Sequence, residues 1–206
     1  QSHLKSFKGI LQADAFAGFD ALYAKSDILE AACWAHARRK FFEIHQAQGS
    51  PIAAEALKRI AALYAIESAV RGQPPDSRLK AREQAKPILD EFHAWLLDTR
   101  RQLSKKSGLA QAIGYALNHW PALIRYASDG RIEIDNNAAE RALRAVALGR
   151  KNFLFAGSDA GGDRAAAIYS LVGSAKLNGL DPEAYLRFVI ERIADYRVSE
   201  LDDLLP

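Results

Sequence analysis

The stretch Arg131-Ile-Glu-Ile-Asp-Asn-Asn-Ala-Ala-Glu-Arg-Ala-Leu-Arg144 changes its hydrophobic period half-way along, and this change indicates the fold class. Its first five residues alternate polar and apolar side chains, which predicts a short strand over 131–135. Asn136 and Asn137 interrupt the alternation and open a predicted helix over 138–148. Because strand and helix patterns follow each other directly, we expect an α/β fold.

The predicted helix over 138–148 carries a polar face and an apolar face. Asn136, Glu140 and Arg144 are spaced four residues apart and share the polar face. A carboxylate flanked by arginines suits phosphoryl transfer on DNA, with the carboxylate holding a metal ion and the arginines holding phosphate. The alternative is a capping box formed by Asn137 and Glu140, and both interpretations stay open at this point. The other face, which we expect to be buried, holds Ala139, Leu143 and Val146.

A second carboxylate follows the segment Gly9-Ile-Leu-Gln-Ala-Asp14, which predicts a short strand over 9–14. The end of a strand is where a sheet exposes a carboxylate to a cleft, so Asp14 is a candidate catalytic residue. The alternative is that Asp14 only caps the helix predicted over 17–25, and spacing alone favours the cap.

The segment around Cys33 is apolar enough for either a buried strand or a helix, and we predict a strand near 30–34 and a helix from about 35. Cys33 and His36 could form half of a zinc site. The sequence has no second cysteine, so a buried thiol and a hydrogen-bonded histidine are favoured. The basic run Arg38-Arg39-Lys40 is either a solvated face or a contact for DNA.

From 52 to 128 apolar residues recur at helical spacing and no clear alternation is present, which predicts helices throughout. Gly72 and Ser107 mark breaks between them. A long helix is expected over 78–103, started or kinked by Pro87. This stretch resembles a helical subdomain inserted between two mixed segments.

The last part of the chain is also mainly helical. A candidate strand over 152–156 precedes the glycine-rich loop 157–162 and an apolar helix over 163–177. The loop is neither a dinucleotide-binding nor a P-loop motif, so nucleotide binding is not supported. It leads into a helix N-terminus, which suits a phosphate contact, although an ordinary turn is the plainer interpretation. A final helix is expected over 182–195.

Composition excludes several classes of protein. The chain of 206 residues is 49% hydrophobic and 26% charged, which is enough to bury a core. No apolar run suggests a membrane-spanning helix or a secretory signal, and a single cysteine excludes an intrachain disulfide. The sequence contains no methionine, even at position 1, so we expect a fragment or a processed product.

Charge is unevenly distributed along the chain, whose formal net charge is +3. Residues 78–106 hold eight basic and four acidic residues, whereas residues 181–206 hold three basic and seven acidic ones. A basic middle suits contact with phosphate.

Several motifs together resemble the transposases of the bacterial insertion-sequence-66 family. The resemblance covers essentially the whole chain, and the Cys-Trp-x-His-x-Arg-Arg and Asp-Asn-Asn-x-x-Glu-Arg blocks are specific in combination. The matching stretches are 11–20, 32–42, 134–144, 149–158 and 178–206.

The resemblance implies a DDE-type transposase with a ribonuclease-H-like core, which holds two Mg²⁺ or Mn²⁺ ions between two aspartates and one glutamate. Matched by motif, Asp14 is the second acid and Glu140 the third. Cys33 and His36 match a supporting motif between those acids. The first aspartate is expected upstream of residue 1, so this chain alone is expected to be inactive.

We therefore expect a predominantly helical α/β protein: a partial ribonuclease-H-like core, a large all-α insertion and C-terminal helices. The expected domains are 1–43 and 129–177 for the core, 44–128 for the insertion and 178–206 for the tail. The alternatives are a non-catalytic helical module that binds DNA or protein, and a nuclease of the same fold. Expected DNA contacts are Arg38, Arg39, Lys40, Asn137, Arg141, Arg144, Arg150 and Lys151.

The expected partners are the DNA ends of the element, target DNA and further copies of the chain, with no membrane. The expected location is the bacterial cytoplasm, in association with the nucleoid.

Overall fold

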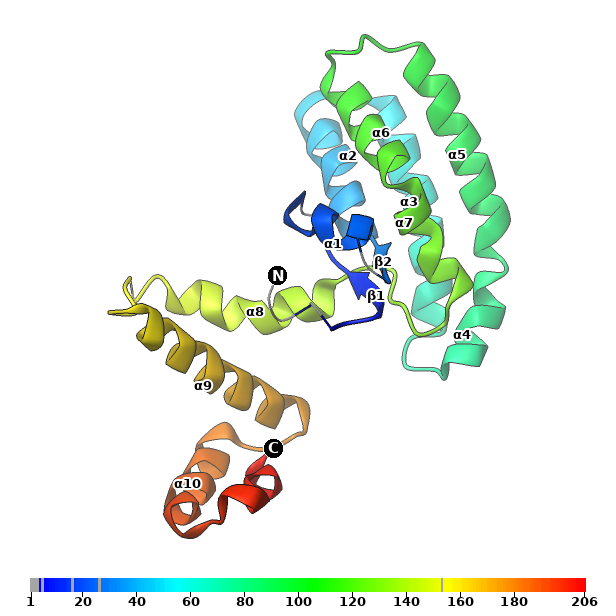
Figure 1. The fold of residues 1–206 in the computed structure, drawn as a ribbon. Coiled ribbons are helices and arrows are strands. Elements are labelled where there is room, and N and C mark those ends of the chain that lie inside the picture. Colours follow the sequence, from blue (N-terminus) through cyan, green and yellow to red (C-terminus); the bar gives the residue numbers. More distant parts are fainter. Residues whose placement is uncertain (1–3, 5, 16, 26, 153) are drawn as a thin grey trace. The chain divides into compact units, whose positions relative to one another are not determined.

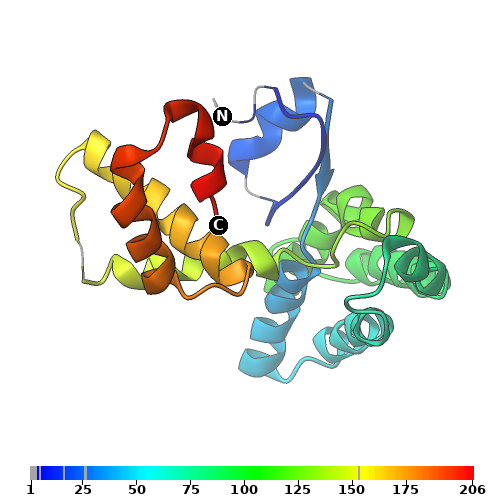
Figure 2. The same ribbon diagram turned by 90° about the horizontal axis from the view of Figure 1, so that it is seen from below.

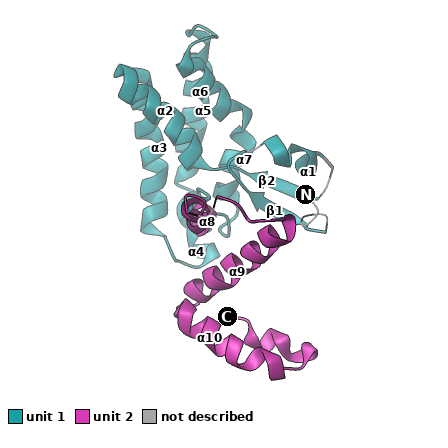
Figure 3. Ribbon diagram, turned by 90° about the vertical axis from the view of Figure 1, so that its left-hand side faces the viewer, with its two compact units in different colours: residues 1–137 teal, residues 138–206 magenta. Residues whose placement is uncertain are grey.

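The computed structural model describes residues 4, 6–15, 17–25, 27–152 and 154–206. They form two compact units, residues 1–137 and residues 138–206 (Figure 3). The described residues contain one two-stranded sheet among many helices, so the expected predominantly helical α/β class is confirmed. The four-part domain division stays a prediction.

The sheet lies in the first unit and consists of two parallel strands (Figure 1). Strand β1 (Gly9–Gln12) pairs with β2 (Ile28–Ala31), in a register that sets Gly9 opposite Ile28. The crossover between them contains the short helix α1 (Asp20–Lys25), preceded by the 3₁₀ turn Ala17–Phe19. The strand predicted over 9–14 is confirmed over 9–12, and the helix predicted over 17–25 is confirmed as a 3₁₀ turn followed by α1.

The predicted boundary between strand and helix near Cys33 is shifted. Strand β2 ends at Ala31, and helix α2 begins at Trp34 rather than at residue 35. The residues between are all buried, so a hydrophobic run continues across the end of the strand and hides the boundary.

The stretch 44–128 contains no strand, so the predicted helices are confirmed in a part of the chain that the structure describes throughout. Serine side chains fix two of the helix starts: Ser50 accepts a hydrogen bond from the Ala53 amide, and Ser107 accepts one from the Ala110 amide. The helices are α2 (Trp34–Gln48), α3 (Pro51–Ala69), α4 (Pro75–Arg82), α5 (Ala85–Arg101), α6 (Gly108–Asn118) and α7 (Trp120–Ile124), followed by the 3₁₀ turn Arg125–Ser128.

The single long helix predicted over 78–103 is wrong. The chain breaks at Glu83 and Gln84, between α4 and α5. Pro87 explains the position of the break, because a proline ring collides with the carbonyl four residues earlier, here Glu83. Pro87 is tolerated in the first turn of α5, where a missing amide hydrogen removes no helical bond.

The core of the first unit is centred on Trp34, at the start of α2. Its indole nitrogen donates to the Leu123 carbonyl at 2.9 Å, and its ring lies 6.0 Å from Phe92 and 5.8 Å from Trp120, centroid to centroid. Trp34 is fully buried, and the start of α2, three residues after β2, is thereby tied to α5 and α7. The helices thus hold the end of the sheet in place.

The strand predicted over 131–135 is wrong, although its alternation is real. Ile132 and Ile134 are buried and Glu133 is exposed, as a strand facing a core requires. The backbone nevertheless forms no ladder in the described residues, because its polar groups bond mostly to side chains and helix ends. We call residues 129–136 the strap, since they run from the last helix of this unit to the next one.

The second unit is made of helices. Helix α8 (Asn137–Gly149) begins at the last residue of the first unit, and α9 and α10 pack together (Figure 2). The predicted helices over 138–148 and 182–195 are confirmed, while the one predicted from 163 begins four residues earlier. The remaining elements are α9 (Asp159–Leu177), α10 (Pro182–Arg192) and the 3₁₀ turns Ile193–Asp195 and Val198–Leu204.

Two predictions for this unit are wrong. Of the strand predicted over 152–156, residue 153 lies outside the described residues, and the other four form no strand. The apolar face of α8 is not buried, since Leu143 is 64% exposed. Within the second unit, the Tyr169 hydroxyl of α9 lies close to Gly149, the last residue of α8. Among the described helices, none is both long enough and apolar enough to cross a membrane.

Candidate functional site

The carboxyl ends of β1 and β2 bring two of the predicted site residues to one edge of the sheet. Asp14 follows β1 by two residues and Cys33 follows β2 by two residues, and the parallel register continues from Gln12 opposite Ala31. The Ala13 amide still donates to the Ala31 carbonyl at 3.0 Å, so the pairing persists beyond the strands. The ends of parallel strands are where α/β sheets place ligands.

Asp14 is exposed at this edge. The alternative interpretation of Asp14, as a cap of the helix that follows, stays a prediction, because residue 16 lies outside the described residues. The Tyr115 hydroxyl donates to the Asp14 backbone carbonyl at 3.3 Å. Burial raises the pKa of Tyr115 to about 12, and the negative charges of Cys33 and Asp14 add to the rise.

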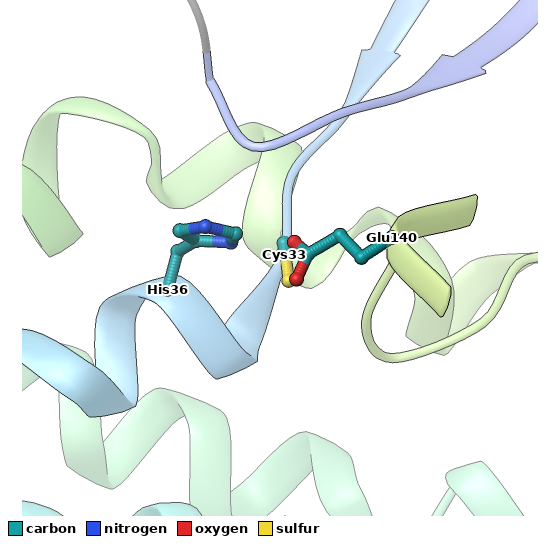
Figure 4. Close-up of side chains that lie close together, drawn as sticks. All are labelled: Cys33, His36 and Glu140. Atoms are coloured by element: carbon teal, nitrogen blue, oxygen red, sulfur yellow. The ribbon is translucent and has the colours of Figure 1, made fainter. Parts of the chain in front are cut away.

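Cys33 and His36 lie at the start of α2, where a sulfur and a ring nitrogen are within 4.8 Å of each other. Figure 4 shows both side chains, together with Glu140 on α8. Burial raises the pKa of the Cys33 thiol, against hydrogen bonds from the Asn136, His36 and Ala35 amides that lower it. Because metal binding needs the thiolate, this buried thiol is poorly suited to hold zinc alone.

The basic run on α2 divides between two sides of the helix. The Lys40 ammonium lies 4.5 Å from the centre of the Tyr115 ring, on the side of Asp14. Arg38 and Arg39 instead line a hollow of about 630 Å³, together with Tyr64 and Asn137. Four of the residues predicted to contact DNA therefore occupy two separate places in the first unit.

The start of α8 is fixed by a residue that the sequence analysis did not single out. Asp135 accepts a hydrogen bond from the Asn137 amide at 3.1 Å and another from the Tyr64 hydroxyl at 3.0 Å. Asn137 is already the first helical residue, so it does not stand before the helix as the capping-box alternative requires, and its amide is instead held by Asp135 two residues earlier. An aspartate just before a predicted helix indicates a hydrogen bond to the start of that helix, so the role of Asp135 could have been found from the sequence. No sequence pattern indicates the hydrogen bond from Tyr64.

The remaining predicted site residues belong to the second unit. Glu140 is half-buried on α8, and its convergence with Asp14 of the first unit stays a prediction. The glycine-rich loop ends at Ser158, whose side chain caps α9 by accepting from the Gly161 amide at 3.1 Å. The exposed basic residues of this unit that were predicted to bind DNA are Arg141, Arg144, Arg150 and Lys151.

Comparison with protein families decides what kind of chain this is. A family model described as Transposase IS66 family matches residues 1–164, and the IS66 C-terminal element matches residues 170–206. The chain belongs to the IS66 transposase family. The predicted resemblance is thereby confirmed, since the two models together cover nearly the whole chain.

Curated relatives of this IS66 family member are longer than the chain. It is 43% identical to the uncharacterized protein y4hP and 41% identical to the uncharacterized protein y4jD, both of Sinorhizobium fredii strain NGR234. All of the chain is matched in each case, and it spans 40% and 42% of their lengths. No solved structure matches it significantly.

Proposed function

We propose that this chain is part of the catalytic region of a DDE-type DNA transposase. In the intact protein, Asp14, Glu140 and a further aspartate outside these residues would hold the divalent metal ions for cutting element ends and joining them to target DNA. The observation that carries the proposal is the gathering of Asp14, Cys33 and His36 at the carboxyl ends of two parallel strands, in a member of a transposase family.

The donor chemistry suits Mg²⁺ or Mn²⁺. Aspartate and glutamate offer hard oxygen ligands, which these ions prefer, whereas the raised pKa of the Cys33 thiol disfavours a zinc site. When bound, such ions would activate water or a 3′-hydroxyl and stabilise charge on the phosphate. Asp14 is exposed at the edge of the sheet and therefore accessible to an ion.

The ribonuclease-H-like core is also part of the proposal. The succession β1, α1, β2 with parallel strands supplies one crossover unit of such a core. The further aspartate would belong to the longer protein, so the chain by itself would neither cut nor join DNA.

Basic residues on both units would hold DNA by its phosphates. Arg38 and Arg39 border the hollow that also contains Asn137, which places cations next to the start of the helix that carries Glu140. Lys40 lies on the side of Asp14. The exposed arginines of α8 would position the strand, and Cys33 with His36 would support the acids. Function in the bacterial cytoplasm at the nucleoid, as an assembly of several copies, completes the proposal.

An assay with the intact transposase and precut element ends tests this function. Joining that requires Mg²⁺ or Mn²⁺, and that is lost in Asp14→Asn and Glu140→Gln while DNA binding persists, is the expected result. Asp20→Asn on α1 and Glu183→Gln on α10 are matched controls that keep activity. Cutting without joining would identify a nuclease, and binding without metal dependence would identify a non-catalytic module.

A further inference from the structure

We propose that Tyr64, through the strap 129–136, is a positioning residue for the Glu140-bearing helix. The structure ties the strap to four elements of the first unit, with its last link from Tyr64 to Asp135. This inference rests on the proposed function, in which Glu140 would hold a metal ion and must therefore be held in position. In this proposal the helical stretch 44–128 helps to orient the helix that carries Glu140.

The deepest anchor of the strap is Arg82 on α4, which is fully buried. Its guanidinium forms a two-point ion pair with Glu67 on α3, with both contacts at 2.7 Å. It also donates to three backbone carbonyls around the strap, those of Tyr126, Asp129 and Ile132, at 2.7, 2.9 and 2.9 Å. A single guanidinium thus donates hydrogen bonds to backbone carbonyls that have no partner in a neighbouring strand.

The middle of the strap is held from two sides. Arg78 on α4 donates to the Glu133 carboxylate at 2.7 Å and to the Ile132 carbonyl at 3.2 Å. From the sheet, the Gln12 side chain donates to the Glu133 carbonyl at 2.6 Å, and the Trp34 amide donates to the Ile134 carbonyl at 3.1 Å. The strap therefore keeps its register against both the helices and the end of the sheet.

The end of the strap is held next to the first turn of α8. The Tyr64 hydroxyl donates to one oxygen of Asp135, whose other oxygen accepts the Asn137 amide. The Asn136 amide points to the Cys33 sulfur at 3.5 Å. Burial, followed by the charge of Asp135, raises the pKa of Tyr64, so its hydroxyl stays protonated and can only act as donor towards the carboxylate.

These links fix Asn137, the first residue of α8, and Glu140 lies three positions further along the same helix. A continuous helix transmits the direction of its first turn to the next. Tyr64 would therefore set the direction of the first turn of α8 without binding the metal itself.

Tyr64→Phe removes the hydroxyl alone, and Tyr126→Phe is a matched control. Tyr64 is partly buried and Tyr126 is buried, but the Tyr126 hydroxyl has no hydrogen-bond partner among the described residues. The Asn136 amide of the strap donates to the Cys33 sulfur, so release of the strap should expose this thiol to an alkylating reagent. The rate of Cys33 alkylation in the intact transposase, measured by mass spectrometry of the peptide, therefore reports that release. The Mn²⁺ concentration at half-maximal joining reports the metal site.

We expect Tyr64→Phe to raise the Cys33 alkylation rate and the Mn²⁺ midpoint by about threefold or more, as the loss of one hydrogen bond predicts, with unchanged DNA affinity. Tyr126→Phe should change neither. Alkylation equal to wild type would overturn the positioning role, and so would faster alkylation with an unchanged Mn²⁺ midpoint. If the wild type joins no DNA, the proposed function fails, and alkylation alone then decides whether Tyr64 holds the strap.

Discussion

At the scale of single residues, Arg82 is the side chain on which the first unit depends most. It is fully buried and balances Glu67, which is 5% exposed. Arg82→Ala would leave the Tyr126 and Asp129 carbonyls without this donor, and the buried Glu67 carboxylate would keep only Arg78, at 3.6 Å. We expect the substitution to lower the free energy of unfolding by about 3–5 kcal/mol.

Urea unfolding measures this effect, with Arg101→Ala as the control. Arg101 pairs with Asp98 on the surface, where both side chains are more than two-thirds exposed. An exposed pair of this kind contributes about 0–1 kcal/mol. Equal effects of the two substitutions would show that the buried network does not hold this unit together.

The pH response of the strap depends on Asp129. Hydrogen bonds from Arg131 lower the pKa of this carboxyl from 3.8 to about 2. Because the folded-state pKa is the lower one, this interaction stabilises the fold fully above pH 3.8 and is lost as the pH falls towards 2. An NMR titration of the Asp129 carboxyl should show a midpoint near 2, and Arg131→Ala should return it towards 3.8. A midpoint unaffected by that substitution would contradict the assigned cause.

At the scale of elements, Gly130 shows how closely the strap approaches α4. A side-chain carbon at this position would lie 1.9 Å from the Pro75 carbonyl oxygen. We expect Gly130→Ala to destabilise the fold by about 1–3 kcal/mol, as overpacking against backbone does. At Gly108, the first residue of α6, the same space is empty, so Gly108→Ala should be neutral or stabilising. Thermal unfolding of the two variants should therefore differ in sign, and a harmless Gly130→Ala would contradict the close approach.

The exposed face of α8 leads to a prediction about DNA binding. If Arg144 holds a phosphate, Arg144→Ala in the intact transposase should weaken binding to all DNA sequences and reduce the salt dependence by about one unit of slope. Arg187→Ala on α10 is the control, since Arg187 pairs with Glu183 one turn away at 3.3 Å. A salt series with element-end DNA measures both slopes. An unaltered slope for Arg144→Ala would show that Arg144 holds no phosphate and is an ordinary residue of the helix surface.

Elements were predictable from the sequence where the signal is local. The helices over 52–128 follow from apolar spacing, and the last helix follows from Pro182. The strand over 131–135 was not predictable, because alternation reports which side chains are buried and not where the backbone bonds go. The break between α4 and α5 required knowing that Pro87 would be placed in a first turn.

The candidate site was predictable to a similar extent. Asp14, Cys33 and His36 stand at strand or helix ends in the sequence, and the structure brings Asp14 and Cys33 to the same edge. Tyr64 and Asp135 are separated by 71 positions, and neither belongs to a motif that announces their contact. Contacts of this range depend on the packing of α3 against the strap, which local patterns do not encode.

At the scale of the whole molecule, the central proposal is that Asp14 of the first unit and Glu140 of the second would hold the same metal ions. Metal-directed cleavage tests it without requiring activity. Fe²⁺ bound in place of Mg²⁺ generates hydroxyl radicals with ascorbate and peroxide, and these radicals cut the peptide chain beside the metal. The intact transposase should be cut near residues 14 and 140, and excess Mg²⁺ should suppress both cuts.

The decisive comparison is the same experiment on Asp14→Asn. Loss of a group that supports a metal ligand lowers metal affinity about 10- to 100-fold, so losing a ligand itself should weaken the cut near Glu140 at least as strongly as the cut near Asp14. Asp20→Asn should leave both cuts unchanged. A cut near residue 140 that survives in Asp14→Asn, or cleavage near only one of the two acids in the wild type, would contradict a shared metal site.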